Sequence, residues 1–439
     1  MPAGMGPATG LAFHDALTTI VQQAQRHAAH REQIERVPLT AALGRALAQD
    51  VYSRIALPPW DNAGMDGYAV QRADVLGASA TSPRVFPVIG TSVAGADATA
   101  LPWVQRGTAV RIMTGAPLPP GADAVVRVED TDGGETQVSI RHDRDTAGRG
   151  NVRPRGEDVA AGSVLFGKGT TVRTSHLGAL ASIGAAEVSV YRAPRVTVVS
   201  SGDELVMLDR FDDVLAGHRI VSSSSYALPA LLRGAGADVT MAPLAPDTLD
   251  GLTSALRDAL DAGCDLLVTT GGVSVGAHDF TRDALAALGG AQQFWRARIR
   301  PGGPIGTGEV RGVPWLGLPG NPVSTMVTGA LFAWPFIRTL GGHAAVHHLR
   351  VPVRMLDRAE TPAPLTYFLR VSLHAGADGS LEARLSGAQG SNLLRTMAMA
   401  DALLEVPATQ ECVEAGSLMQ AILLPDAPLL VAGTPGRST

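Results

Sequence analysis

The sequence has few cysteines and no long apolar run, and each shortage excludes a class of protein. Among 439 residues there are only two cysteines, Cys264 and Cys412, far apart and without CxxC spacing. By themselves they form neither a disulfide framework nor a zinc cluster, so we expect two buried or idle thiols. The most apolar stretch, from Val327 to Ile337, is about half a membrane span and contains Pro335. We therefore expect no membrane partner.

An excess of positive charge is also missing. The formal net charge is −5 at pH 7, which provides no electrostatic footprint for DNA, RNA or an anionic membrane. We therefore expect no nucleic-acid partner. The opening "MPAGMGPATGLAFHDAL" has neither the basic segment nor the apolar core of a signal peptide, which predicts a cytoplasmic protein.

Glycine and proline, in contrast, are abundant. The 50 glycines and 29 prolines are spread along a chain that is 45% hydrophobic, a composition typical of a folded protein with many turns. The length favours roughly three domains, and no repeat of fixed period indicates a solenoid.

The chain begins with helical and then β-type patterns. Apolar spacing predicts a helix from Phe13 to about Arg36 and a shorter helical segment over Leu39–Gln49. Short β-branched runs between Gly, Pro and Asp clusters then predict a mostly-β module from Val51 to about Arg141. A connecting region follows, with a helix near Ser175–Ile183.

From residue 195 to residue 340, strands alternate with helices, which predicts βαβ units and a parallel sheet covered on both faces. The expected strands are 195–201, 237–245, 265–270 and 294–300, with a hairpin over 304–318. The expected helices are 226–236, 248–263, 280–290 and 322–340. The last 90 or so residues return to short β-runs and predict a separate β module.

Ligands of an open parallel sheet bind beyond the carboxyl ends of its strands. The residues that follow these strand ends are Glu204, Asp247, Gly271, Gly272, Ser274, Asp279, Arg296, Arg300, Gly320 and Asn321. Backbone N–H groups at glycine turns and helix starts bind anions, and arginines hold a second oxyanion by forked hydrogen bonds. Carboxylates beside an anion indicate a hard cation such as Mg²⁺.

Each of these residues also has a plainer interpretation. Asp279 is suited to cap the following helix, and Glu204 and Asp247 suit solvated loops. The two arginines fit an exposed strand face, and Gly320–Asn321 fits an ordinary turn. In the β module, Asp66–Gly67 fits a hairpin turn.

A histidine group also has two interpretations. The segment "GGHAAVHHL" places His343, His347 and His348 together, which suggests either a metal site or a solvated linker. We favour the linker, since no carboxylate or cysteine lies nearby.

Six motifs occur in a fixed order: "DNAGMDGYAV", "RIMTGAPLPPGADAVVRVED", "RGEDVAAG", "SSGDEL", "TTGGVSVGAHDFT" and "LPGNPVS". In these motifs the chain resembles the molybdopterin molybdenumtransferases, the MoeA and gephyrin E-domain family, from about residue 11 to 425. The resemblance implies insertion of molybdenum from molybdate into adenylylated molybdopterin with release of AMP, assisted by Mg²⁺. This is the last step of molybdenum cofactor biosynthesis, downstream of a molybdopterin adenylyltransferase that donates the substrate.

The resemblance also implies an elongated homodimer of four-domain subunits, with α/β and β modules and an active site composed from both chains. The expected parts are an N-terminal helix packing with the α/β domain (11–33), a connecting domain I (34–51 and 142–187), a mostly-β domain II (52–141), a MogA-like three-layer α/β domain III with the substrate site (188–346), and a C-terminal β-barrel-like domain IV (347–432).

Matching positions carry the family's site residues onto this sequence. The resemblance implies catalytic roles for Asp66, Thr114, Glu204, Asp247 and Asp279, with Asp66, Glu204 and Asp279 as the Mg²⁺ ligands. It implies substrate or anion binding by Gly271, Gly272, Ser274, Arg296, Arg300, Gly320, Asn321, Arg370 and Ser391. The arginines at 296 and 300 stand where the family commonly has lysine, which keeps the charge but changes its geometry.

Other positions depart from the family pattern. Ala277 replaces a glutamate, Gly303 a lysine and Leu365 an arginine, and serines 222–225 stand where an asparagine is expected. Arg395 and Thr396 stand where two serines are frequent. We expect these changes to affect substrate affinity and metal choice more than the class of reaction.

Two other functions remain open at this point. One is a molybdopterin adenylyltransferase, whose single domain resembles residues 195–340. The other is a non-catalytic pterin-binding or scaffold paralogue. The additional modules on both sides of the α/β domain argue against the adenylyltransferase.

Overall fold

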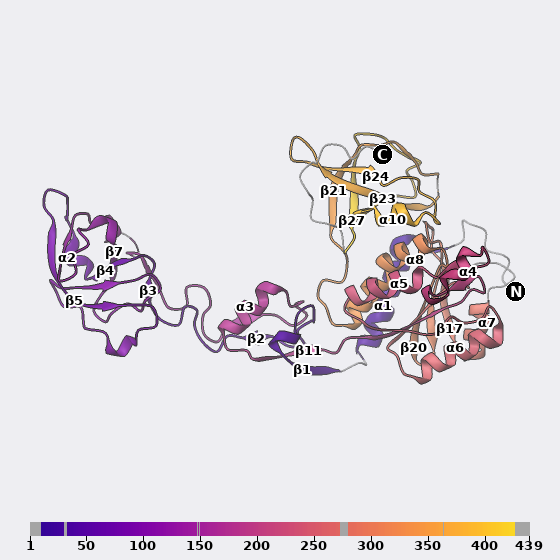
Figure 1. Ribbon diagram of the computed structural model, residues 1–439, viewed down its shortest axis with the longest axis horizontal. Coiled ribbons are helices and arrows are strands. Elements are labelled where there is room, and N and C mark those ends of the chain that lie inside the picture. The colour runs from indigo at the N-terminus through magenta and orange to yellow at the C-terminus, as the bar shows by residue number, and fades with distance from the viewer. Residues whose placement is uncertain are drawn as a thin grey trace.

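The computed structural model describes residues 10–29, 33–146, 148, 150–272, 280–362 and 364–425. The molecule is elongated (Figure 1). A mostly-β body lies at one end, a small middle body follows, and an α/β body with a C-terminal β barrel beside it forms the other end. Within the described residues, no helix is both long and apolar enough to cross a bilayer.

The mostly-β body is built on a five-stranded sheet in the order β7-β4-β6-β5-β8. Buried apolar side chains pack on both of its faces, in two clusters that include Tyr68 on one face and Ala69 on the other. Its elements are β3 (Asn62–Ala63), β4 (Gly67–Val70), α2 (Arg72–Val75), β5 (Arg84–Ser92), β6 (Ala109–Ile112), β7 (Ala124–Arg127), β8 (Gln137–Ile140) and β9 (Val152–Arg153).

The middle body consists of two small antiparallel ladders and one helix. Strand β1 pairs with β11, and β2 pairs with β10. The elements are β1 (Ile34–Pro38), β2 (Val51–Tyr52), β10 (Val164–Phe166), α3 (Thr174–Ser182) and β11 (Glu187–Tyr191). The helix predicted near Ser175–Ile183 is therefore present.

Two helix predictions at the start of the chain were wrong in extent. Helix α1 is described over Phe13–Ala29, and Ile34–Pro38 is a strand because all five residues pair with β11. Within Leu39–Gln49 only a 3-10 turn forms, at Leu39–Ala41. Gly44 there has a φ of +77°, and the N–H of Leu47 donates to the Thr170 carbonyl at 3.0 Å. Long-range pairing thus takes the backbone groups that a helix needs.

The α/β body contains a six-stranded sheet in the order β15-β12-β16-β20-β19-β17. The first four strands are parallel, and β19 runs antiparallel to both β20 and β17. The strands are β12 (Arg195–Ser200), β15 (Asp238–Met241), β16 (Leu266–Thr270), β17 (Ala291–Arg296), β19 (Pro304–Val310) and β20 (Val313–Leu318). A short excursion after β12 holds β13 (Leu205–Val206), α4 (Phe211–Leu215) and β14 (Ile220–Val221).

Helices cover both faces of this sheet, as predicted. One buried cluster joins the sheet to α1, α5 (Ser224–Gly234), α8 (Pro322–Thr328) and α9 (Trp334–Leu340). A second joins the other face to α6 (Leu249–Asp261) and α7 (Phe280–Ala287). A π-helical turn, Gly329–Ala333, connects α8 with α9. Helix α1 buries Phe13, Ala16, Ile20 and Ala24, which lie three or four residues apart on one helix face.

The strand predicted over 294–300 is divided. Strand β17 ends at Arg296, and β18 (Ile299–Arg300) leaves the α/β sheet to pair with β23. The division occurs because the N–H of Arg298 donates to the carbonyl of Leu11 at 2.8 Å, and Thr366 donates to the carbonyl of Arg298 at 3.0 Å.

The C-terminal strands close into a barrel. β23 pairs with β24 and β25, and β21 pairs with β24 and β27, while β25–β27 pairing completes the ring. The elements are β21 (Arg350–Met355), β22 (Ala359–Glu360), β23 (Thr366–Ala375), β24 (Leu381–Leu385), α10 (Leu394–Ala398), β25 (Ala402–Val406), β26 (Cys412–Val413) and β27 (Leu418–Leu423). This ring confirms the barrel-like form predicted for the end of the chain.

Candidate functional site

Loops after three parallel strands meet at the carboxyl edge of the α/β sheet. Gly271, after β16, has a φ of +84°, and a Cβ there would lie 3.0 Å from the carbonyl oxygen of Ser201, after β12. A Cβ on Gly320, after β20, would lie 3.3 Å from the Cα of Gly271. The sequence thus folds three separate loops into one rim, where small residues allow the backbones to approach closely.

Carboxylates gather at the same rim. An oxygen of Asp203 accepts a hydrogen bond from the N–H of Asp247 at 3.1 Å, which ties the loop after β12 to the loop after β15. Next to it, Glu204 accepts at its backbone carbonyl from Ile220 at 2.9 Å, and its side chain folds back over Gly202. The motif "SSGDEL" predicted that Asp203 lies at this strand end beside Glu204, but only Glu204 and Asp247 were assigned a role in the site.

The expected glycine cradle is only partly available. The N–H of Gly271 donates to the carbonyl of Leu318 at 3.2 Å, which continues the pairing of β16 with β20. This amide is therefore not available to an anion. Gly272 has a φ of +63° and follows at the rim. Ser274, Ala277 and Asp279 lie outside the described residues.

Arg296 ends β17, which runs in the same direction as β20, so its Cα belongs to the same sheet edge as the other loops. Its side chain is half-buried and forms no ion pair with any described residue. Arg300 is exposed, and its guanidinium lies 5.7 Å from the centre of the Tyr367 ring in the barrel. One guanidinium, that of Arg296, thus belongs to the rim, and the other, that of Arg300, lies beside the barrel.

The barrel reaches the rim through Ser391. Asn321 precedes α8 and donates through Nδ2 to the hydroxyl of Ser391 at 3.3 Å. The N–H of Val323, in the first turn of α8, donates to the Ser391 carbonyl, also at 3.3 Å. Two predicted site residues from different bodies, Asn321 and Ser391, are therefore in contact.

The predicted site residue Arg370 lies in strand β23 of the barrel and is buried. Its side chain is 0% exposed, and burial lowers the pKa of its guanidinium. Nη2 donates to the carbonyls of Ala388 at 3.0 Å and Gly390 at 3.1 Å, and Nε donates to the Thr396 hydroxyl at 3.0 Å. Arg370 thus supports from below the loop that carries Ser391.

Asp66 and Thr114 form a compact pair in the mostly-β body. One oxygen of Asp66 accepts from the Thr114 hydroxyl at 2.7 Å and from the Thr114 N–H at 2.6 Å. These two bonds, the hydroxyl bond first, lower the pKa of the Asp66 carboxyl below its usual value. The exposed carboxylate is therefore ionised at neutral pH.

Gly67 explains why this pair lies where it does. A Cβ at position 67 would be 1.9 Å from the carbonyl oxygen of Val126, so only glycine allows β4 to pair this closely with β7. The N–H of Val128 then donates to the Asp66 carbonyl at 2.9 Å. The Asp66 backbone is fixed by the sheet, and its side chain stands at the sheet's end.

The two groups of predicted residues are at opposite ends of the molecule. The body with β4, which carries Asp66 and Thr114, lies at the far end from the body with β20 and α8 (Figure 1). Within the parts of the chain that the structure describes, no three His, Cys, Asp or Glu side chains gather in a metal-binding cluster. Asp66 and Glu204, the two expected Mg²⁺ ligands among the described residues, are thus not brought together within one chain.

The histidine segment is neither a metal site nor a solvated linker at His343. This side chain is 8% exposed, and its Nδ1 lies 2.8 Å from the hydroxyl of Thr171 in the middle body. His348 is half-buried, with Nε2 3.1 Å from the Ala330 carbonyl. Only His347 of the three is exposed, as expected for a linker.

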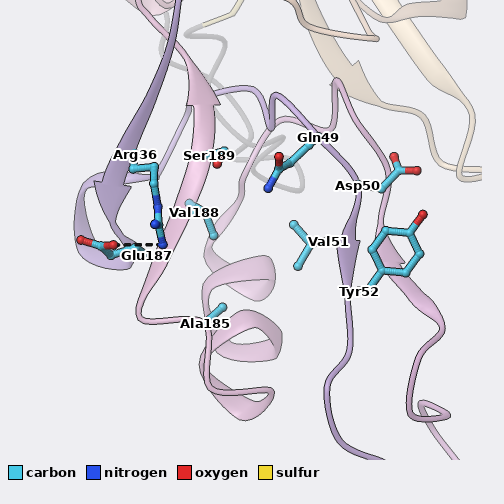
Figure 2. Close-up of a pocket in the computed structure, with 9 residues that line it drawn as sticks. All are labelled: Arg36, Gln49, Asp50, Val51, Tyr52, Ala185, Glu187, Val188 and Ser189. Atoms are coloured by element: carbon cyan, nitrogen blue, oxygen red, sulfur yellow. Dashed lines mark ion pairs between the residues drawn. The ribbon is translucent and has the colours of Figure 1, made fainter.

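A hollow in the middle body contains none of the predicted site residues (Figure 2). It lies between β2 and β11 and has a volume of about 440 Å³. On the β11 side of the hollow, Arg36 and Glu187 form an ion pair at 3.2 Å with both side chains more than half exposed, an arrangement that contributes little to stability. Its lining residues are Arg36, Gln49, Asp50, Val51, Tyr52, Ala185, Glu187, Val188 and Ser189.

Three family profiles match the chain along nearly its whole length. They are described as "MoeA N-terminal region (domain I and II)" over residues 11–184, "Probable molybdopterin binding domain" over 197–339, and "MoeA C-terminal region (domain IV)" over 352–424. The order of the three matches follows the order of the bodies in the structure.

Named relatives and solved structures agree with these profiles. Molybdopterin molybdenumtransferase 2 of Mycobacterium tuberculosis is 38% identical over 391 residues, covering 88% of this chain and 93% of that protein. Molybdopterin molybdenumtransferase of Bacillus subtilis is 33% identical, covering 92% and 94%. The molybdopterin biosynthesis moeA protein of Pyrococcus horikoshii OT3 has a TM-score of 0.79 at 25% identity, covering 95% of this chain and all of that one.

The three profiles, in this order, and the named relatives define a multidomain transferase of the molybdopterin class. Because relatives of at least 33% identity span most of the chain, it belongs to the MoeA family of molybdopterin molybdenumtransferases.

Proposed function

We propose that this protein inserts molybdenum from molybdate into adenylylated molybdopterin and releases AMP. The observation that carries the proposal is the rim of the α/β body, in a chain 38% identical to a protein named molybdopterin molybdenumtransferase. There Asp203, Glu204 and Asp247 lie beside small-residue loops, with Arg296 on the same sheet edge. Such a rim suits a ligand that carries phosphate groups.

The site is completed by a second copy of the chain in this proposal. Asp66 and Thr114 are remote from the rim of their own chain (Figure 1), yet they form an ordered, ionised pair at the end of a sheet. A homodimer in which this pair faces the other subunit's rim unites the two groups of residues. The Asp66 carboxylate then stands opposite Glu204 of the second subunit.

Mg²⁺ fits this composite site better than it fits one chain. Carboxylate oxygens are the ligands that Mg²⁺ prefers, and Asp66 and Glu204 come from different subunits in the proposed dimer. Bound there, Mg²⁺ would neutralise charge on the adenylate phosphates. The residues of the chain itself hold and orient the substrate: the arginines bind oxyanions, and the Thr114 hydroxyl orients the Asp66 carboxylate by donating to it.

The adenylylated substrate implies an upstream partner, a molybdopterin adenylyltransferase that makes it from molybdopterin and ATP. The proposed reaction accordingly belongs to the cytoplasm, where ATP is available.

Purified protein given adenylylated molybdopterin, molybdate and Mg²⁺ tests the proposal. We expect AMP release and formation of molybdenum cofactor, both dependent on molybdate and on the cation. Synthesis of the adenylate from molybdopterin and ATP, without a partner protein, would instead identify an adenylyltransferase. Pterin binding without AMP release, with unchanged cofactor levels after deletion of the gene, would identify a scaffold.

A further inference from the structure

A tight turn after α9 docks into the middle body. Gly342 has a φ of +70°, and a Cβ there would lie 2.3 Å from the Tyr191 ring at the end of β11. The N–H of Ala344 donates to the carbonyl of Gly169 at 2.9 Å, and a Cβ on Gly169 would lie 3.2 Å from the Cβ of Ala344. The two bodies thus approach closely here because neither Gly169 nor Gly342 carries a side chain.

Three side chains form a hydrogen-bonded chain at this junction. Arg338, in α9, donates through Nη2 to the Thr171 hydroxyl at 2.9 Å. Because that oxygen accepts from Arg338, the hydroxyl proton is free to be donated to Nδ1 of His343 at 2.8 Å. Arg338 also donates through Nε to the Ala345 carbonyl at 2.7 Å, which fixes its guanidinium.

Burial and nearby positive charges keep the His343 imidazole neutral, the form in which Nδ1 can accept a hydrogen bond. Burial first, then Arg338 of α9 and Arg45 of the middle body, lower the pKa of His343 to about 3. Arg45 itself donates to the Tyr191 carbonyl at 2.6 Å and pairs with Glu35, while the Lys168 ammonium lies 5.7 Å from the Tyr191 ring centre. A neutral imidazole accepts the Thr171 proton, whereas an imidazolium would present a donor to it.

The α/β body and the middle body are connected by the chain at two places, and the junction adds a third, non-covalent connection. The chain passes between the α/β body and the middle body between α1 and β1, and again between β11 and β12. Asp265 holds the second crossing by accepting from Arg192 at 2.9 Å and from the N–H of Arg195 at 2.7 Å. The contact of Thr171 with Arg338 and His343 lies elsewhere in the sequence, so it restricts rotation about the two crossings.

We propose that Thr171, His343 and Arg338 are positioning residues that fix the angle between the α/β body and the middle body. The middle body carries the mostly-β body at its far end (Figure 1), so a small rotation at the junction displaces Asp66 and Thr114 much further. The angle therefore determines where this pair stands against the second subunit's rim. The catalytic part of this inference rests on the proposed function, and the geometric part does not.

The test compares Thr171→Val with Thr171→Ser in the full-length protein. Valine has the shape of threonine without the hydroxyl, and serine keeps the hydroxyl. We expect the valine variant to show an altered distance distribution in small-angle X-ray scattering and a kcat lower by roughly tenfold, since misplacement by about 1 Å can cost more than this. KM for adenylylated molybdopterin stays unchanged because the rim is untouched, and the serine variant behaves as wild type.

A second variant, His343→Phe, removes the acceptor and keeps an aromatic ring, and we expect it to match Thr171→Val in both readouts. If both variants scatter as wild type, the positioning role is wrong, whatever the activity. Altered scattering with unchanged kcat would overturn the link to catalysis. The scattering measurement needs no substrate, so the geometric test remains valid even if the wild-type protein is inactive. Absence of AMP release by the wild-type protein would contradict only the proposed function.

Discussion

At the scale of single residues, the Asp66–Thr114 pair offers a sharp test because the chain contains a close copy of it. Asp97 accepts from the Thr99 hydroxyl at 2.7 Å and from the Thr99 N–H at 2.9 Å. The same two kinds of bond, the hydroxyl bond first, lower the pKa of the Asp97 carboxyl. Asp97 lies in a loop of the same body and belongs to no proposed site.

We predict that Asp66→Asn lowers kcat for AMP release by about 100-fold or more, since asparagine removes the charge that would face the metal and the substrate. Asp97→Asn should leave kcat within about twofold of wild type, because a surface substitution outside a site has little effect. Initial rates at saturating substrate, with circular dichroism to verify folding, check both. Wild-type activity in Asp66→Asn would remove this residue from the mechanism.

His343 makes a pH-dependent contribution to stability. Its pKa is about 3 in the folded protein, against a usual value of 6.5, so the unfolded chain binds the proton more tightly. The contribution of neutral His343 to the free energy of unfolding is therefore fully present above pH 6.5. It decreases as the pH falls from 6.5 toward 3, by up to about 1.4 kcal/mol per pH unit.

We therefore predict that the urea midpoint falls between pH 7 and pH 5 by more in wild type than in His343→Gln, which has no proton to bind. Fluorescence-detected unfolding at the two pH values measures the difference. Equal falls in the two proteins would show that His343 is not buried in its neutral form.

At the scale of elements, glycine has opposite effects in a strand and in a helix. Gly67→Ala places a Cβ 1.9 Å from the Val126 carbonyl, and β4 must separate from β7 to admit it. In α3, a Cβ on Gly178 meets nothing within 4 Å. We predict that Gly67→Ala destabilises by roughly 1–3 kcal/mol and that Gly178→Ala stabilises by roughly 0.5–1 kcal/mol. Thermal unfolding compares the two, and a neutral Gly67→Ala would contradict the described pairing.

Elements with strong local periodicity were predictable from sequence, and elements set by distant partners were not. The helices and strands from 195 to 340 follow the expected alternation, because each buries an apolar face in a repeating unit. Strand β1 and the division between β17 and β18 were missed. Their backbones pair with Tyr191, Leu11 and Thr366, which are far away in the sequence.

Some features of the candidate site were also predictable from the sequence, and others were not. Parallel strands end at one edge, so the meeting of Ser201, Gly271 and Gly320 followed from strand order. The buried position of Arg370 and the junction role of His343 depend on contacts between distant segments. No periodicity in the sequence encodes such contacts.

At the scale of the whole molecule, the proposed site requires two copies of the chain. Its two groups of site residues lie at opposite ends of one elongated subunit (Figure 1). In the dimer that we propose, each arm reaches the rim of the other subunit, so a two-fold dimer would contain two equivalent composite sites. Each site would take Asp66 from one chain and Glu204 from the other.

The most direct measurement is complementation between two inactive variants, Asp66→Asn and Glu204→Gln, which are mixed, dissociated and reassociated. Half of the dimers become mixed, and in each of these one of the two sites has both residues intact. We therefore predict recovery of about a quarter of wild-type AMP release. If mixed dimers form and no activity returns, Asp66 and Glu204 do not act across subunits, and the central claim is wrong.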